Sequence, residues 1–176
     1  MPAASMTSRR SAQRDEVIQA SLQELAPPLL RYFRRRVDHA EDAADLVAEC
    51  FYVIWKRRSV FPADAERARM WTYGIAANVL KTWRRKAGRR SELVQRLREH
   101  LMTWSSAPEL ESVRDALARL PDTQVELIQL VHWDGFTIID AAALLGISES
   151  TARGRYQRAR AILAADPAIA ELRRTP

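Results

Sequence analysis

A tight turn near the C-terminus restricts the fold of this chain more than any other feature of its sequence. Residues 136–145 place apolar side chains at helical spacing, which predicts a short amphipathic helix. Gly146 follows at the position where a left-handed residue ends a helix, and Ser148 is of a type that caps the start of the next one. Ile147 lies between them and can fill the angle between the two helices. The sequence therefore predicts two helices joined by a sharp bend.

The second of these helices, expected over residues 149–164, has two different faces. Its apolar face is formed by Ala152, Tyr156, Ala159 and Leu163. The opposite face carries short or hydrogen-bonding groups that fit the major groove of DNA, namely Ser150, Arg153, Gly154 and Gln157. The flanking bases that can hold phosphates are Arg155, Arg158 and Arg160. A helical hairpin with a solvated, Arg-rich helix is the alternative, but the turn and the basic helix together favour DNA binding.

The rest of the chain also predicts helices. No segment alternates apolar and polar residues as a strand does, only five glycines occur, and Ala, Leu and Arg are abundant. Helices are expected over residues 15–25, 29–37, 41–57, 66–87, 110–119, 122–133, 137–145 and 149–164. Pro27-Pro28 is expected to separate the first two, and Gly88 to end the long one. The predicted fold class is therefore all-α.

The sequence suggests two small helical domains joined by a flexible linker. Residues 105–108, Ser-Ser-Ala-Pro, look like a joint. We expect a disordered N-terminus over residues 1–14, a first domain over 15–90, a linker over 91–109 and a second domain over 110–176. A chain of 176 residues is long enough for two such domains.

Charge is segregated along the chain. The net charge of +6 and the isoelectric point near 10.1 suggest a polyanionic partner. Residues 40–54 hold four acids and no Lys or Arg, whereas residues 81–90 hold six bases and no acid. Residues 109–149 are again acidic, and residues 150–165 hold four Arg and no acid. Because a merely solvated surface usually mixes both signs, the two basic patches are interpreted as binding surfaces.

The two central helices of the first half are also divided into faces. In residues 41–57 an apolar face that includes Leu46 opposes an acidic one, formed by Glu41, Asp42, Asp45 and Glu49. In residues 66–87 an apolar stripe that includes Trp71 opposes Asn78, Lys81 and Arg85. Asn78 can hydrogen-bond a base edge, and the bases after it can grip phosphates. Trp71 is expected in the core, while Tyr73 and Trp83 suit either the core or stacking on unpaired bases.

Nothing in the sequence points to catalysis. His39, His100 and His132 are scattered, and neither metal-ligand spacing nor a Gly-rich phosphate loop occurs. We therefore expect no catalytic residue, no bound metal and no cofactor. The single cysteine, Cys50, lies on an apolar face and is expected to be a buried, inert thiol in a reducing cytoplasm. No apolar run is long enough to span a membrane, and no secretory signal is evident.

The order of these segments resembles the extracytoplasmic-function sigma factors of the sigma-seventy family, which bring RNA polymerase to promoters. Residues 26–37 and 42–55 resemble their regions 2.1 and 2.2, and residues 71–80 with the basic run after them resemble regions 2.3 and 2.4. Residues 116–122 and the helix-turn-helix after them resemble region 4. The resemblance covers nearly the whole chain, from about residue 15 to residue 163.

The resemblance implies a transcription initiation factor with bipartite promoter recognition. Core polymerase would dock, through its clamp helices, on Asp42, Asp45, Leu46, Glu49 and Tyr52, and its flap is a further expected contact. The minus-ten element, duplex and melted non-template strand, would meet Phe61, Asn78, Lys81, Trp83, Arg84 and Arg85. The loop of residues 59–64 would capture a flipped base. The minus-thirty-five element would meet Ser150, Arg153, Gly154, Arg155, Gln157 and Arg158. An anti-sigma partner is a further implied possibility.

Two other functions are less compatible with the sequence. An enzyme is not favoured, because the chain offers no set of reactive side chains arranged for catalysis. A stand-alone helix-turn-helix regulator would use residues before Gly88 as a sensor or for dimerisation, and would bind a palindromic duplex tightly by itself. The sequence also departs from the family pattern at Ala44, Ala77, Lys81, Ala152 and Gly154, so no promoter sequence is inferred.

Overall fold

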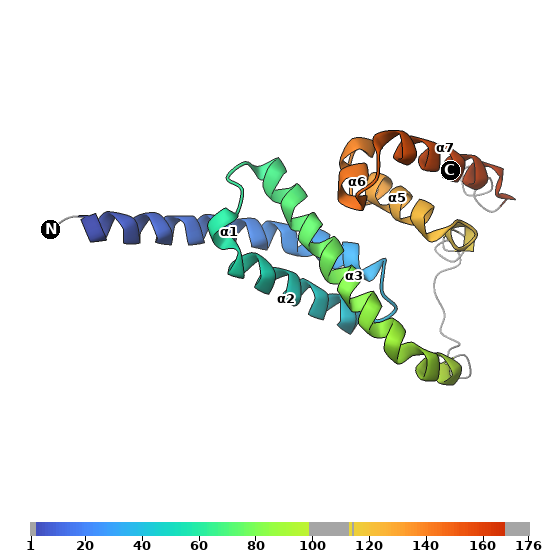
Figure 1. Ribbon diagram of the computed structural model, residues 1–176, viewed down its shortest axis with the longest axis horizontal. Helices are drawn as coiled ribbons and strands as arrows, with labels where there is room; N and C mark the ends of the chain where they lie inside the picture. Colours follow the sequence, from blue (N-terminus) through green and yellow to red (C-terminus); the bar gives the residue numbers. More distant parts are fainter. Residues whose placement is uncertain (1–2, 99–112, 114, 168–176) are drawn as a thin grey trace, which may run out of the picture. The chain divides into compact units, whose positions relative to one another are not determined.

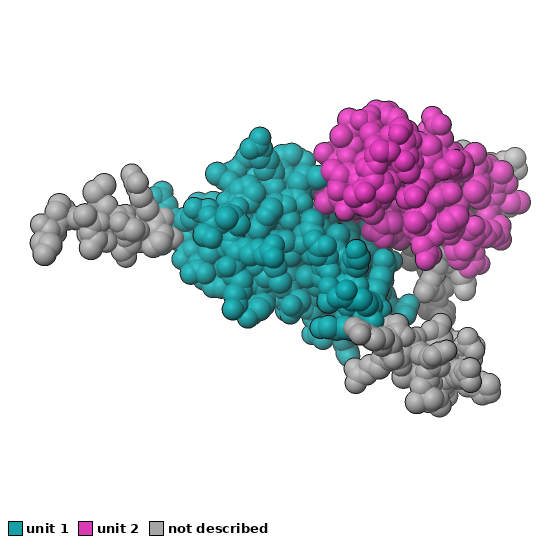
Figure 2. All heavy atoms as spheres, viewed as in Figure 1, with its two compact units in different colours: residues 1–92 teal, residues 93–176 magenta. Residues whose placement is uncertain are grey.

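The computed structural model describes residues 3–98, 113 and 115–167. The chain divides into two compact units, residues 1–92 and 93–176 (Figure 2), and we describe each by itself. All the regular elements among the described residues are helices (Figure 1), which confirms the predicted all-α class.

Unit 1 is built from three α-helices and one short turn of 3-10 helix. They are α1 (Ala3–Arg34), α2 (Ala40–Lys56), η1 (Arg58–Val60) and α3 (Ala65–Arg98). Helix α2 packs beside α1 (Figure 1). Apolar side chains from all three helices form the core, among them Leu29, Phe33, Leu46, Ile54, Ile75 and Leu80. The apolar faces predicted for α2 and α3 are thus the faces that the core buries.

Aromatic contacts join α1 to α3 at the centre of this core. The ring of Tyr32 meets that of Tyr73 edge-on at 5.4 Å and that of Phe33 at 5.2 Å. The guanidinium of Arg36 lies 3.8 Å from the centre of the Tyr32 ring and donates to the Tyr32 carbonyl at 3.0 Å. Tyr73 is only 2% exposed, so it is a core residue and is not available to stack on DNA bases.

Helix α1 differs from the sequence prediction in two places, at Pro27-Pro28 and at its N-terminal end. Pro27 and Pro28 lie inside the helix and do not break it. Ile18 before them and Leu29 after them are both buried in the same core, and this burial offsets the backbone hydrogen bonds that the prolines remove. The helix also begins at Ala3, so the backbone of residues 3–14 is helical, where disorder was expected. Contacts of Arg14 with the loop after η1 help to order this end.

Helix α3 continues through Gly88, where the sequence suggested an end. Residues 91–98 of the expected linker therefore belong to this helix. A single glycine costs a helix about 1 kcal/mol relative to alanine, which is too little to end it without a left-handed cap. The rest of the expected linker, residues 99–109, lies outside the described residues.

Unit 2 contains α5 (Asp122–His132), α6 (Ile138–Leu145) and α7 (Glu149–Ala165), and each contacts the other two. Residues 115–118 are also helical, as part of the helix expected over 110–119. The core of the unit is a cluster of Leu120, Ile128 and Ala159, against which Leu117, Val125, Tyr156 and Leu163 pack. After α7 the chain is fastened by an ion pair of 2.7 Å between Arg119 and the buried Asp166.

The environment of Cys50 predicts an unreactive thiol. Cys50 is fully buried in the unit 1 core, and this burial, with the nearby charge of Glu49, raises its pKa from 9.0 to about 12. Roughly one thiol in ten thousand is then ionised at pH 8, and the thiolate is the reactive form. We expect a chromogenic disulfide reagent to label the native protein only as fast as the protein unfolds, and to label it at once in denaturant. A Cys50→Ala variant is the blank, and rapid labelling of native protein would contradict burial.

Candidate nucleic-acid and polymerase interfaces

The bend between α6 and α7 has the geometry that the sequence predicted. Gly146 adopts the left-handed conformation, with φ of 65°. The amide of Gly146 donates to the Ala143 carbonyl at 3.2 Å, and that of Ile147 donates to the Ala142 carbonyl at 3.0 Å. This pair of hydrogen bonds is the Schellman arrangement that ends a helix. Ser148 then caps α7, because its hydroxyl accepts from the Thr151 amide at 3.2 Å.

Helix α7 presents the predicted DNA-reading side chains to solvent. Ser150, Arg153, Gln157 and Arg158 are exposed, while Gly154 and Arg155 are partly exposed. The guanidinium of Arg153 is held by Glu149 one turn earlier, with 2.8 Å between Nε and Oε1. Arg153 is therefore directed along the helix, toward Glu149.

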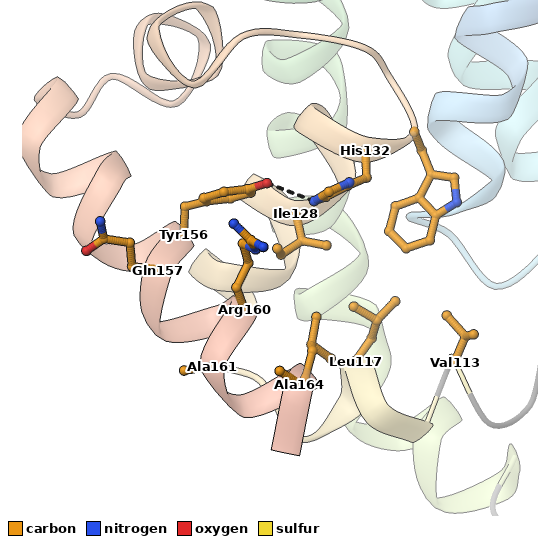
Figure 3. Close-up of a pocket in the computed structure, with 11 residues that line it drawn as sticks. Val113, Leu117, Ile128, His132, Tyr156, Gln157, Arg160, Ala161 and Ala164 are labelled. Carbon is orange, nitrogen blue, oxygen red and sulfur yellow. Dashed lines mark hydrogen bonds between the residues drawn. The ribbon is translucent and has the colours of Figure 1, made fainter. Parts of the chain in front are cut away.

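The opposite face of α7 fixes the helix on α5. Ala152 and Ala159 are fully buried. Tyr156 stacks on His132 of α5, with ring centres 5.8 Å apart, and its hydroxyl lies 3.0 Å from the His132 Nε2 (Figure 3). Sequence reasoning placed Tyr156 on the buried face but had no signal for this partner, because the two residues are 24 positions apart. Together with the buried Ala152 and Ala159, this contact holds the inner face of α7 against the rest of unit 2.

An open groove of about 950 Å³ lies beside this contact in unit 2. Its walls come from α5, α7 and the segment before α5, and they are mostly apolar, with Leu117, Ile128 and Leu163 among them (Figure 3). Arg160 also lines it, with its guanidinium 5.9 Å from the centre of the Tyr156 ring. The groove is a surface of unit 2 that the sequence did not indicate.

In unit 1, the basic side chains of α3 lie on its outer face. Lys81, Arg84 and Arg85 are exposed, and Trp83 is half-buried. Asn78 is also exposed, and its side-chain amide donates to the Gly74 carbonyl at 3.0 Å. Asn78, Lys81 and Arg85 recur at intervals of three and four residues and share one accessible, positively charged face of α3, with Arg84 at its edge and Trp83 on another side of the helix.

The loop between η1 and α3 differs from the prediction at Phe61. This side chain was expected to contact DNA, but it is 7% exposed and packs edge-on against Trp71 at 5.7 Å. Phe61 is the large apolar residue of the loop that can reach the apolar stripe of α3, so burying it is favourable. The exposed residues here are Ser59 and Val60 of η1, the second of them 64% exposed, and Ala63 and Asp64 of the loop itself.

The acidic face of α2 is accessible, with one exception among the predicted polymerase contacts. Asp45 and Glu49 are exposed, Asp42 is half-buried, and Tyr52 is 56% exposed. Leu46 is only 4% exposed, because it belongs to the apolar face of the helix, and it supports this surface from the core. Trp55, at 43% exposure, extends the same end of α2 and was not among the predicted residues.

The described residues contain no cluster of three or more side chains that would suit a metal ion. No helix among them is long and apolar enough to cross a lipid bilayer.

Comparisons with protein families agree with the two-unit structure. Residues 22–90 match the model of Sigma-70 region 2, and residues 110–163 match that of Sigma-70, region 4. The chain is 33% identical over 147 residues to the ECF RNA polymerase sigma factor EcfG of Rhodopseudomonas palustris, which covers 80% of each chain. It is 31% identical over 139 residues to the ECF RNA polymerase sigma factor SigF of Caulobacter vibrioides, which covers 77% of each.

Solved structures with a similar fold include a sigma factor. One is the sigma factor RpoE in complex with the anti-sigma factor NepR from Bartonella quintana, with a TM-score of 0.60 and 27% identity over 82% of this chain and 96% of that one. Another is CnrH in complex with the cytosolic domain of CnrY, with a TM-score of 0.61 and 26% identity over 88% and 92% of the two chains.

This chain therefore belongs to the sigma-70 family of RNA polymerase sigma factors. Within that family it is an extracytoplasmic-function (ECF) sigma factor, and it directs promoter-specific transcription. Membership decides against the stand-alone helix-turn-helix regulator and confirms the resemblance found in the sequence.

The two glycines of the helix-turn-helix predict stability changes of opposite sign. Gly146→Ala forces a side chain into the left-handed region and should cost about 1–2 kcal/mol. Gly154→Ala meets open space, with the nearest atom, Arg158 Nη2, at 4.0 Å, and should add up to about 1 kcal/mol through helix propensity. Thermal melting followed by circular dichroism measures both. Equal shifts, or a loss for Gly154→Ala, would contradict these conformations.

Proposed function

We propose that this ECF sigma factor docks on core RNA polymerase through the acidic face of α2 and reads promoter DNA through α3 and α7. The observation that carries the proposal is the exposure of one basic helix face in each unit, together with an accessible acidic face on α2. Unit 1 would then act as region 2 and unit 2 as region 4, which agrees with the segments that match those two family models.

The outer face of α3 is the proposed surface for the minus-ten element. Lys81, Arg84 and Arg85 would hold phosphates, and Asn78 would read a base edge after releasing the Gly74 carbonyl. Trp83 is half-buried, so the exposed part of its ring can stack on a base without any change in the helix. The adjacent loop, residues 59–64, would receive the extruded base, through its exposed part and not through Phe61.

The outer face of α7 is the proposed surface for the minus-thirty-five element. Its N-terminal turn begins at the Ser148 cap, so Ser150, Arg153 and Gln157 would enter the major groove first. Arg155 and Arg158 would contact phosphates at its edges. Tyr156, held by His132, would set the angle of entry.

Docking on polymerase would use charge on unit 1 and an apolar surface on unit 2. Asp42, Asp45, Glu49 and Tyr52 would meet the clamp helices. The groove between α5 and α7 fits an apolar segment of the polymerase flap. The sigma factor RpoE was solved with the anti-sigma factor NepR, which supports a similar partner for this protein. We propose that the protein acts in the cytoplasm, as a recognition subunit and not as a catalyst.

Run-off transcription tests the proposed function directly. Core polymerase with this protein should yield discrete transcripts from promoters mapped by start-site sequencing after overexpression, and core polymerase alone should not. The protein alone should bind duplex DNA weakly and without sequence preference. Sequence-specific duplex binding without polymerase, and no promoter-dependent transcript with it, would refute the proposal.

Reversing the charge of the α2 face should disrupt docking. Replacing Asp42, Asp45 and Glu49 together by Lys should weaken binding to core polymerase at least about tenfold, or about 1.4 kcal/mol, because like charges would then oppose each other. Asp45→Lys and Glu24→Lys form a matched pair, since both change one exposed acid in unit 1. Only the first should lower affinity in a core-polymerase titration. Equal affinity for the triple variant and the wild type would rule out this surface.

The Gly154→Ala variant distinguishes an effect on the stability of the protein from an effect on DNA recognition. Because Gly154→Ala should stabilise the free protein, a loss of minus-thirty-five-dependent transcription in this variant would show that α7 needs close approach of its backbone to the bases. We expect such a loss, about threefold to tenfold, with no change on promoters whose activity does not need that element. Full activity on both promoter types would mean that glycine is merely tolerated here.

A further inference from the structure

The loop between η1 and α3 is fastened to the rest of unit 1 from two sides. On one side, the Phe61 side chain is buried against Trp71 of α3. On the other, Arg14 of α1 donates from its Nη2 to the Ser59 carbonyl at 2.6 Å and to the Phe61 carbonyl at 3.3 Å. The backbone of the loop is therefore held between the first and third helices.

Among the described residues, two polar contacts join α1 to residues 58–61, and that of Arg14 is the stronger. The second is an ion pair of 3.6 Å between Asp15 and Arg58, whose side chains are 39% and 46% exposed. An ion pair of such exposure is weak, because water screens it. Both hydrogen bonds come from Nη2 of the guanidinium, whose two N–H groups lie in the fixed plane of that group, and they are charge-assisted.

Arg14 lies outside the segment that matches Sigma-70 region 2, which begins at residue 22. Arg14 lies in the N-terminal part of α1, which begins at Ala3. Residues 58–64, which are η1 and the loop after it, stay exposed at Ser59, Val60, Ala63 and Asp64, so the contact leaves the face that would meet a base open.

We propose that Arg14 is a positioning residue for promoter opening, which fixes the loop of residues 58–64 in the shape that receives an extruded base. This inference rests on the proposed function of that loop. Extruding a base from the duplex is unfavourable, and the site that traps it must compensate. A loop that is already ordered loses less conformational entropy on capture, so releasing it should lower the fraction of open promoter. Arg14 acts through the loop carbonyls and touches no base in this role.

The test measures promoter opening by the complete holoenzyme. A fluorescent adenine analogue in the non-template strand of the minus-ten element reports unpairing, on a duplex promoter mapped as above. Run-off transcription is compared on that duplex and on the same promoter with a pre-melted bubble. The variants are Arg14→Ala, Arg14→Lys and the control Arg31→Ala, which removes one exposed positive charge from the same helix.

We expect Arg14→Ala to lower opening on the duplex about threefold to tenfold and to leave transcription from the bubble unchanged. Arg14→Lys keeps the charge but replaces the two in-plane N–H groups of Nη2 by a rotating ammonium on a flexible stem, so it should recover less than half of this loss. Arg31→Ala should match the wild type on both templates.

Three results would overturn the inference. The first is that Arg14→Ala opens the duplex promoter as well as the wild type does, and the second is that it loses as much transcription on the bubble as on the duplex. The third is that Arg14→Lys recovers opening fully, which would mean that charge alone attracts DNA. If Arg14→Ala melts at a lower temperature, the test uses Arg14→Lys, which preserves charge and helix propensity. Reduced opening of the duplex by this variant supports the inference, and wild-type opening contradicts it. Failure of the wild-type holoenzyme itself to open the duplex would instead count against the proposed function.

Discussion

Burial of one face of each helix is the constraint on which the surface of this protein depends. In α2 and α3 the apolar stripe is fixed in the core by residues such as Leu46, Ile54 and Ile75. Once that stripe is buried, the helical period determines which side chains point outward, and these are the acids of α2 and the bases of α3. In α7, Ala152 and Ala159 play the same part. The proposed binding surfaces are thus a consequence of core packing in each unit.

Most of the fold, and the parts of the site on regular helices, could be predicted from sequence. The signals were local: a helical period, a glycine in the left-handed turn at Gly146, and a capping hydroxyl at Ser148. Such signals depend on a few neighbouring residues, so they do not need knowledge of the tertiary structure. The family resemblance then supplied the order of the segments and the function.

The errors arose where distant contacts outweigh local preference. Pro27 and Pro28 read as a break, yet packing on both sides of them keeps α1 continuous. Phe61 read as an exposed loop residue, yet Trp71 gives it a place in the core. Arg14 read as part of a disordered basic end, yet carbonyl groups 45 and 47 positions away accept its hydrogen bonds. None of these partners can be identified from spacing along the chain.

Placing the two basic helix faces on separate units of one chain also affects how selectively the protein can act. On the proposed function, a polymerase that holds both units keeps the second face at a high effective concentration near its element once the first has bound. Each face would then be weak alone, and strongly dependent on salt, while joint engagement by the holoenzyme would be tight. Isolated half-sites would retain the holoenzyme only briefly, and residence would be long only where both elements occur at the separation that the docked units require.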